Sequence, residues 1–163
     1  MNPVKESSIA DIERNGYLGI ERTLAPKNVL EMRKEYAETA ISLWMHAASS
    51  DTPNKHQERK KVLEFIQLLF HEGSLFPPSM YKESEQKNIL IDLVKEKEPM
   101  TIEEISEYLK GKKELILAFF YDACLLVYLD GKLVSTENDF LDTIAGAWGI
   151  TKLEKRTTME KFQ

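Results

Sequence analysis

The sequence predicts an all-α protein, a single-domain bundle of about seven helices. Its 163 residues fit one domain, and 42% of them are hydrophobic, which is enough to build one buried core. Apolar residues recur at helical spacing in one segment after another. No segment alternates between apolar and polar residues with a period of two, so we expect no β-sheet.

The helical domain is expected to cover residues 26–163, after a polar N-terminal extension formed by residues 1–25. Pro26 marks the start of the first long helix, which we expect to run to Ser49. A polar loop from Ser49 to His56 should follow it. The apolar positions that recur at helical spacing in this helix are Ala37, Ala40, Ile41, Trp44 and Ala48.

Three further helices are expected before the most apolar part of the chain. The first runs from Gln57 to His71 and is broken by Gly73 and the pair Pro77-Pro78. The second runs from Tyr81 to Lys95. The third is short, has Thr101 as its N-cap, and ends at Gly111, because glycine readily adopts the conformation that stops a helix.

Three more helices are expected in the last third of the chain, with an Asp-Gly loop between the first two. A central buried helix is expected from Lys112 to Leu129, followed by the loop at Asp130-Gly131. The next helix should run from Thr136 to Trp148, with Thr136 and Asp139 forming a variant of the capping box. A final helix is expected from Thr151 to Lys161.

Charge and cysteine content narrow the class of partner and the compartment. The net charge is −5, and the longest basic run, Arg59-Lys60-Lys61, directly follows an acid. Nucleic acid is therefore not an expected partner, whereas a cation or a basic protein surface is. The single cysteine, Cys124, allows no disulfide within the chain, which fits a reducing compartment.

Membrane insertion and secretion are not expected either. The first twenty residues lack a basic segment followed by an apolar one, so no signal peptide is visible. The most apolar run, Leu115 to Leu129, is too short to span a bilayer comfortably and contains Asp122. We expect a cytoplasmic protein, with Cys124 a buried, inert thiol. Asp122 could join an acidic patch near Asp130, but a place on the polar edge of its helix is favoured.

Two segments share one layout. In each, an apolar helix ends in an aspartate, and after six intervening residues a glutamate opens the next amphipathic helix: Asp51 with Glu58, and Asp130 with Glu137. The apolar faces that follow also align. The matching pairs are Val62 with Leu141, Phe65 with Ile144, and Leu69 with Trp148. The sequence therefore predicts two pseudo-repeated helix–loop–helix units.

The four acids could form one cation site if the two units pack about a pseudo-twofold axis. An aspartate at a helix C-terminus is not favoured by the helix dipole, which makes a bound cation an attractive explanation. Hard cations such as Ca²⁺ or Mg²⁺ prefer carboxylate oxygens. The alternative is that these are ordinary surface acids at loops and helix starts. Neither loop has the acids that an EF-hand requires.

These segments resemble the tellurite-resistance TerB family and its TerB-like superfamily. Such domains are all-helical and contain two repeats of an Ala-rich helix, an Asp-Gly loop and a glutamate seven positions after the aspartate. The stretch from Asp130 to Glu137 is similar to this motif, whereas the stretch from Asp51 to Glu58 has Thr52-Pro53 at the glycine position. The resemblance covers about Lys27 to Phe162.

The resemblance implies a non-catalytic binding or regulatory module linked to tellurite or stress resistance. It also implies a divalent metal ion held by Asp51, Glu58, Asp130 and Glu137, and a protein partner in complexes that include peripheral membrane assemblies. The sequence contains no motif for catalysis. Two alternatives stay open: a helical protein-interaction scaffold without a metal site, and a transcriptional regulator with a helix-turn-helix beginning at Thr101.

Overall fold

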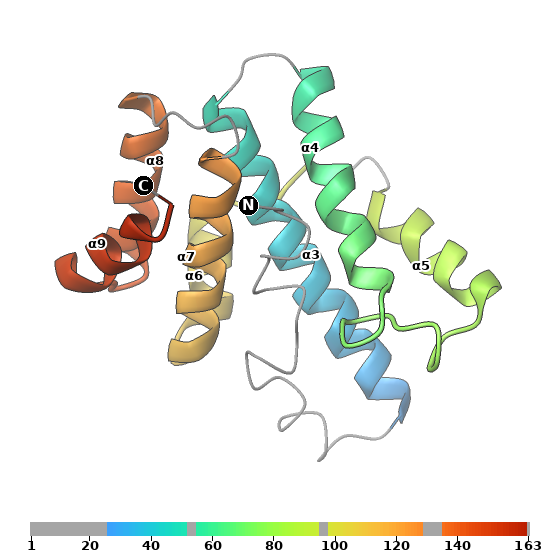
Figure 1. Cartoon of the computed structure of the whole chain (residues 1–163). Coiled ribbons are helices and arrows are strands. Elements are labelled where there is room, and N and C mark those ends of the chain that lie inside the picture. Colours follow the sequence, from blue (N-terminus) through green and yellow to red (C-terminus); the bar gives the residue numbers. More distant parts are fainter. Residues whose placement is uncertain (1–25, 52–54, 95–97, 129–134, 163) are drawn as a thin grey trace.

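The computed structural model describes residues 26–51, 55–94, 98–128 and 135–162, with the side chains of residues 26–28, 51 and 55–59 left aside. Within these ranges the chain forms seven α-helices and one short 3-10 helix, and no strand (Figure 1). The predicted all-α bundle is thereby confirmed. The expected extension at residues 1–25 lies outside the described residues. None of the described helices is long and apolar enough to cross a membrane.

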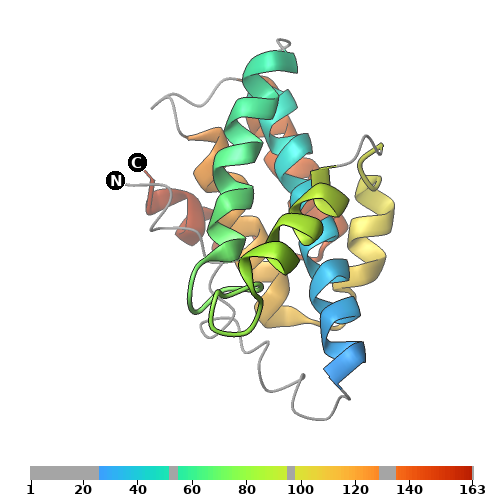
Figure 2. The ribbon, with the colours of Figure 1, turned by 90° about the vertical axis from the view of Figure 1, so that its right-hand side faces the viewer.

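Helix α3 (Pro26–Asp51) is the longest described element and lies at the centre of the bundle. It packs against α4 (Lys55–Gln67) on one side and against α7 (Lys113–Val127) and α8 (Ser135–Ala147) on the other (Figures 1 and 2). Its inward face buries Tyr36, Leu43 and Trp44 completely. Full burial of an apolar side chain of this size contributes roughly 1.5–3 kcal/mol, so α3 is the main packing surface of the fold.

Helix α7 is enclosed by its neighbours. Eleven of its 15 residues are buried, including Phe119 and Phe120, which explains the apolar sequence between Leu115 and Val127. Phe119 meets Tyr36 of α3 edge-on, with 5.7 Å between ring centroids. Asp122 is fully buried too, so the expectation that it forms a polar edge was wrong.

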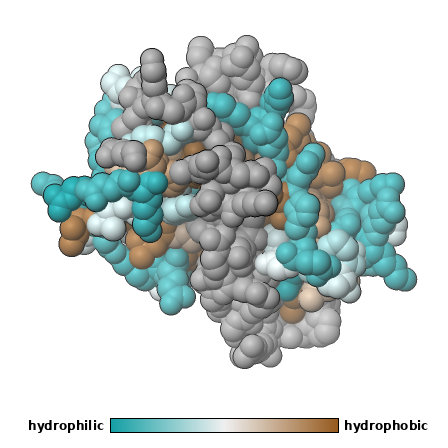
Figure 3. All heavy atoms as spheres, in the orientation of Figure 1, coloured by the Kyte–Doolittle hydropathy of each residue, from teal (hydrophilic) through white to brown (hydrophobic). Residues whose placement is uncertain are grey.

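The two pseudo-repeated units, α3–α4 and α7–α8, bury the aligned apolar positions that the sequence singled out. Both positions of every pair are buried: Val62 with Leu141, Phe65 with Ile144, and Leu69 with Trp148. The polar groups between these stripes face outward, and hydrophilic side chains make up much of the described surface on the face seen in Figure 3. The shared hydrophobic pattern therefore reflects a shared packing role.

The end of α4 and the bounds of α5 differ from those expected. Helix α4 ends at Gln67 and not at His71, and a 3-10 turn, Leu68–Phe70, follows it before Gly73, whose φ is +83°. The segment that follows returns to α3, where Arg33 Nη1 donates a hydrogen bond to the carbonyl of Leu75. Helix α5 (Glu83–Val94) then packs against α3.

In the segment from Ser49 to His56, which was expected to be a polar loop, residues 49–51 and 55–56 are helical, and residues 52–54 lie outside the described ranges. Helix α3 continues to Asp51, and α4 already begins at Lys55. Within the last turn of α3, the Ser49 and Ser50 hydroxyls donate to the carbonyls of His46 and Ala47, at 3.1 and 2.7 Å. Both serine hydroxyls therefore bond back to carbonyls of the preceding turn, as serine commonly does inside a helix.

Two short helices are fixed by their caps. Thr101 precedes α6 (Ile102–Leu109) and forms a reciprocal capping box with Glu104, as Thr151 does with Glu154 before α9 (Lys152–Glu160). The predicted N-cap role of Thr101 is confirmed. Between α8 and α9, Gly149 has a φ of +70°, and Ile150 N–H bonds to the Ala145 carbonyl at 2.9 Å, as in a Schellman turn.

Candidate functional site

The two helix–loop–helix units meet at one end of the bundle. In Figure 1 the C-terminal ends of α3 and α7 and the N-terminal ends of α4 and α8 lie at the top of the molecule. The Thr136 hydroxyl of α8 donates a hydrogen bond to the carbonyl oxygen of Ser50 in α3, at 3.0 Å. This bond links positions 86 residues apart in the sequence, so the start of α8 is tied to the end of α3.

The bond from Thr136 also corrects a local prediction. Thr136 was expected to cap the helix together with Asp139, but α8 begins at Ser135, so Thr136 lies inside its first turn. Its hydroxyl donates to the Ser50 carbonyl of α3 and does not cap α8. Ser50 is in the last turn of α3, where carbonyls have no partner within the helix, so the hydroxyl satisfies a group that would otherwise need water.

The structure describes the four predicted metal ligands unequally. Asp51 is the last residue of α3, and Glu58 lies in the first turn of α4, with the side chains of both outside the description. Asp130 lies outside the described residues altogether. The side chain of Glu137 is described, and it is fully buried in the first turn of α8. Among described residues, no group of three or more His, Cys, Asp and Glu side chains could hold a metal ion.

Burial gives Glu137 a chemistry different from that of a surface acid. A carboxylate removed from water is stable only where hydrogen bonds or opposite charge compensate for lost hydration. The N-terminal turn of α8 supplies part of that compensation through the positive end of the helix dipole. A glutamate in this place is therefore a structural anchor or a ligand, and it differs from an exposed first-turn acid.

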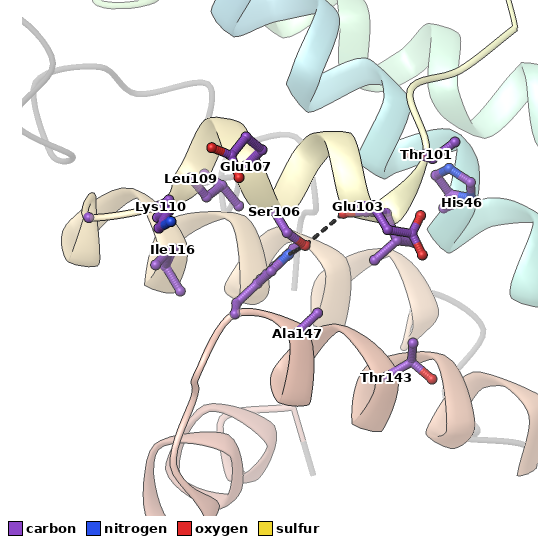
Figure 4. Close-up of a pocket in the computed structure, with 13 residues that line it drawn as sticks. His46, Thr101, Glu103, Ser106, Glu107, Leu109, Lys110, Ile116, Thr143 and Ala147 are labelled. Atoms are coloured by element: carbon purple, nitrogen blue, oxygen red, sulfur yellow. Dashed lines mark hydrogen bonds between the residues drawn. The ribbon is translucent and has the colours of Figure 1, made fainter.

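A groove between α3, α6 and the end of α8 is the second candidate site (Figure 4). Its volume is about 840 Å³. In Figure 4, Ser106 of α6 lies across from Thr143 and Ala147 of α8, with His46 of α3 at the end near Thr101. Sequence reasoning missed this groove, because helices that are separate in the sequence supply its walls.

Hydrogen bonds fix the walls of the groove. Two α3 side chains hold the backbone of Met100: its N–H donates to Ser42 Oγ at 2.9 Å, and His46 Nε2 lies 2.8 Å from its carbonyl oxygen. A carbonyl only accepts, so Nε2 carries the proton of this bond. On the other side, Trp148 Nε1 donates to Ser106 Oγ at 3.0 Å. The groove is consequently pre-formed.

The groove combines an apolar floor with an acidic wall. Leu109, Ile116 and Trp148 line it and are almost entirely buried, while Glu103 and Glu107 line it from the exposed side of α6. Lys110 stands at the end of the same helix stripe. Such a surface is suited to binding by hydrophobic contact with charge selection at its edge.

Cys124 is a poor candidate for chemistry. The thiol is buried in α7, and burial raises its pKa to about 12, with a smaller lowering by Lys155 and a raising by Asp122. Only the thiolate is an effective nucleophile, so the thiol is unreactive at neutral pH. This agrees with the prediction of a buried inert cysteine.

Burial of α7 also bears on the helix-turn-helix alternative. A reader of DNA places its second helix in the major groove, with exposed polar side chains on that helix. Here the helix after α6 is α7, and most of its residues are covered by protein. The segment beginning at Thr101 therefore lacks a recognition helix.

Comparisons of the chain with family models, with curated proteins and with solved structures find no match. Function therefore has to be inferred from the residues and their geometry.

Proposed function

We propose that this protein is a non-catalytic binding module of the TerB-like type that holds a divalent cation, Ca²⁺ or Mg²⁺, at one end of its helical bundle. The observation that carries the proposal is the hydrogen bond from Thr136 to the Ser50 carbonyl, because it joins the two acidic helix–loop–helix units. The proposed ligands are the four carboxylates of Asp51, Glu58, Asp130 and Glu137.

The local electrostatics support a cation at this end. The C-terminal end of α3, where Asp51 is the last residue, carries partial negative charge from its carbonyl groups. Glu137 contributes a carboxylate from a fully buried position. A cation between them would offset both charges, and carboxylate oxygens are the ligands that Ca²⁺ and Mg²⁺ prefer. The TerB-like resemblance would connect such a module to tellurite or stress resistance.

A helical protein-interaction scaffold is the second candidate function. The observation that favours it is the pre-formed groove between α3, α6 and α8, with Trp148 in its floor. The two functions use different residues. One chain could therefore serve both, and variants at one site act as controls for the other.

Thermal unfolding with and without Ca²⁺, Mg²⁺ and Zn²⁺ tests the cation proposal. An ion at a hundred times its dissociation constant should raise the free energy of unfolding by about 2.7 kcal/mol. The double variant Asp130→Asn with Glu137→Gln should lose this ion-dependent gain. The double variant Glu103→Gln with Glu107→Gln makes the same charge change in the groove and should keep it.

The readout is the ion-dependent difference for each variant, so a general loss of stability from altering the buried Glu137 does not confound it. A wild-type protein that gains no stability from any of the three ions at millimolar concentration would refute the cation proposal.

A further inference from the structure

We propose that the groove between α3, α6 and α8 binds a cationic amphipathic helix of a partner protein. In this arrangement the apolar side chains of the partner helix cover Trp148 and its neighbours. Its lysine or arginine side chains face Glu103 and Glu107. The proposal uses none of the four proposed cation ligands and does not depend on the cation site.

The floor of the groove offers an apolar anchor point. Trp148 is 7% exposed and Ile116 is 8% exposed, and Ile102 is half-buried beside them at the start of α6. The exposed edges of these side chains form an apolar floor on which side chains of a partner can pack. A volume of about 840 Å³ lies within the range of ligand pockets and accommodates several apolar side chains.

The acidic wall selects the charge of the partner. Glu103 and Glu107 are one helical turn apart on α6, and in the described part of the chain neither carboxylate forms an ion pair. Like charges at this spacing repel, and Glu107 also lies in the last turn, where the helix dipole disfavours an acid. Two cationic side chains one turn apart on a partner helix would relieve both effects.

The two acids of this wall, Glu103 and Glu107, are not the acid that caps α6. Glu104 accepts from the Thr101 N–H and completes the capping box that starts α6. Glu103 lies in the first turn, where the helix dipole favours an acid, but it takes no part in the capping box, and Glu107 has neither role. Their exposed carboxylates on the groove side are consistent with recognition of a basic partner and oppose the binding of nucleic acid.

The walls are held before any partner arrives. Ser42 and His46 form hydrogen bonds with the backbone of Met100, and Trp148 donates a hydrogen bond to Ser106. Ser106 in turn donates to the Ile102 carbonyl at 2.6 Å. Binding to a pre-formed groove loses little conformational entropy in the receptor, which favours the helix-in-groove mode of recognition.

A synthetic peptide supplies the test. The probe is an amphipathic helix of roughly 14 residues, about four turns, with leucines on one face and lysines on the other. Its matched twin carries glutamates in place of the lysines. The chain has two tryptophans, so in a Trp44→Phe background the fluorescence reports on Trp148 alone. If this background does not fold, isothermal titration calorimetry on the wild-type sequence makes the same comparison.

The lysine peptide should change the signal saturably, and the glutamate twin should not. Glu103→Gln with Glu107→Gln should weaken binding about tenfold, the effect of losing two charge contacts. A matched control, Glu64→Gln with Glu83→Gln, makes the same charge change at exposed positions of α4 and α5 outside the groove, and should bind as the wild type does.

Three results would overturn the proposal: no saturable change with the lysine peptide, equal binding of the glutamate twin, or equal weakening in both double variants. The last would mean attraction to net charge alone. Because the test requires no metal ion, its failure leaves the cation proposal standing, and a failed cation test leaves this one standing.

Discussion

The hydroxyl of Thr136 lies 3.0 Å from the carbonyl oxygen of Ser50 and donates a hydrogen bond to it. The two residues belong to different helix–loop–helix units, and each is next to a proposed cation ligand in the sequence. Asp51 follows Ser50, and Glu137 follows Thr136. The bond therefore places the backbone of one acidic segment against the side chain of the other at a single end of the bundle.

Replacing Thr136 with valine should lower the free energy of unfolding by about 0.5–1 kcal/mol, the net value of one hydrogen bond that is partly open to water. Chemical denaturation measures the change. Thr143→Val is the matched control on the same helix, since among the described residues the Thr143 hydroxyl bonds only to the Asp139 carbonyl in its own helix, at 2.8 Å. An equal effect of the two variants would show that the contact with Ser50 adds nothing.

Replacing Thr101 with alanine should destabilise the protein by about 1 kcal/mol, the usual cost of losing a threonine N-cap. The reason is that the Thr101 hydroxyl accepts the Glu104 N–H at 3.1 Å and fixes the first turn of α6. Thr157→Ala, at an exposed position inside α9, should change stability little. The expectation fails if both variants unfold at the same denaturant concentration as the wild type.

Stability should fall in alkaline solution because of Cys124. Its pKa is raised to about 12 in the folded chain by burial, whereas an unfolded cysteine titrates near roughly 8.5. Below the unfolded pKa both the folded and the unfolded chain hold the proton, so the thiol does not lower the free energy of unfolding there. Between the two values only the unfolded chain ionises, so the free energy of unfolding drops by up to about 1.4 kcal/mol per pH unit.

The Cys124→Ala variant isolates this contribution. It should keep a lower but flatter stability profile from about pH 9 upward, with the remaining decline coming from groups such as Tyr108, whose pKa is also raised by burial. Urea denaturation at several pH values gives both slopes. If wild type and variant decline in parallel, the thiol is not the source of the alkaline loss.

The helices were largely predictable because their signals are local. The cap at Thr101, the stop at Gly149 and the apolar run of α7 each depend on residues within a few positions of one another. The pseudo-repeat was also visible, since matching apolar positions such as Phe65 and Ile144 must be buried in both units. The end of α3 and the start of α4 differ from the prediction because polar residues such as Ser49 and Ser50 suggest a loop, whereas both lie in the last turn of α3.

Features set by contacts between distant segments were not predictable. Asp122 was expected at a polar edge, because a charged residue is usually exposed, but neighbouring helices cover it completely. Thr136 was expected to cap its own helix, and only the packing of α3 against α8 reveals its bond to Ser50. Both predictions failed because they depend on contacts between helices that are distant in the sequence.

The candidate sites divide in the same way. Glu137 was found from spacing within the sequence, although its complete burial was not foreseen. The groove was not found at all, because His46, Ser106 and Trp148 come from three segments and share no motif. The TerB-like resemblance and the four-carboxylate cation site stay predictions.

Calorimetric titration of the purified chain with Ca²⁺ and with Mg²⁺ tests the central proposal most directly, because it measures how many ions bind. The account predicts one ion per chain, loss of that ion in Glu137→Gln, and its retention in Glu103→Gln with Glu107→Gln. Binding that is absent for both ions, or that is unchanged in Glu137→Gln, would contradict it.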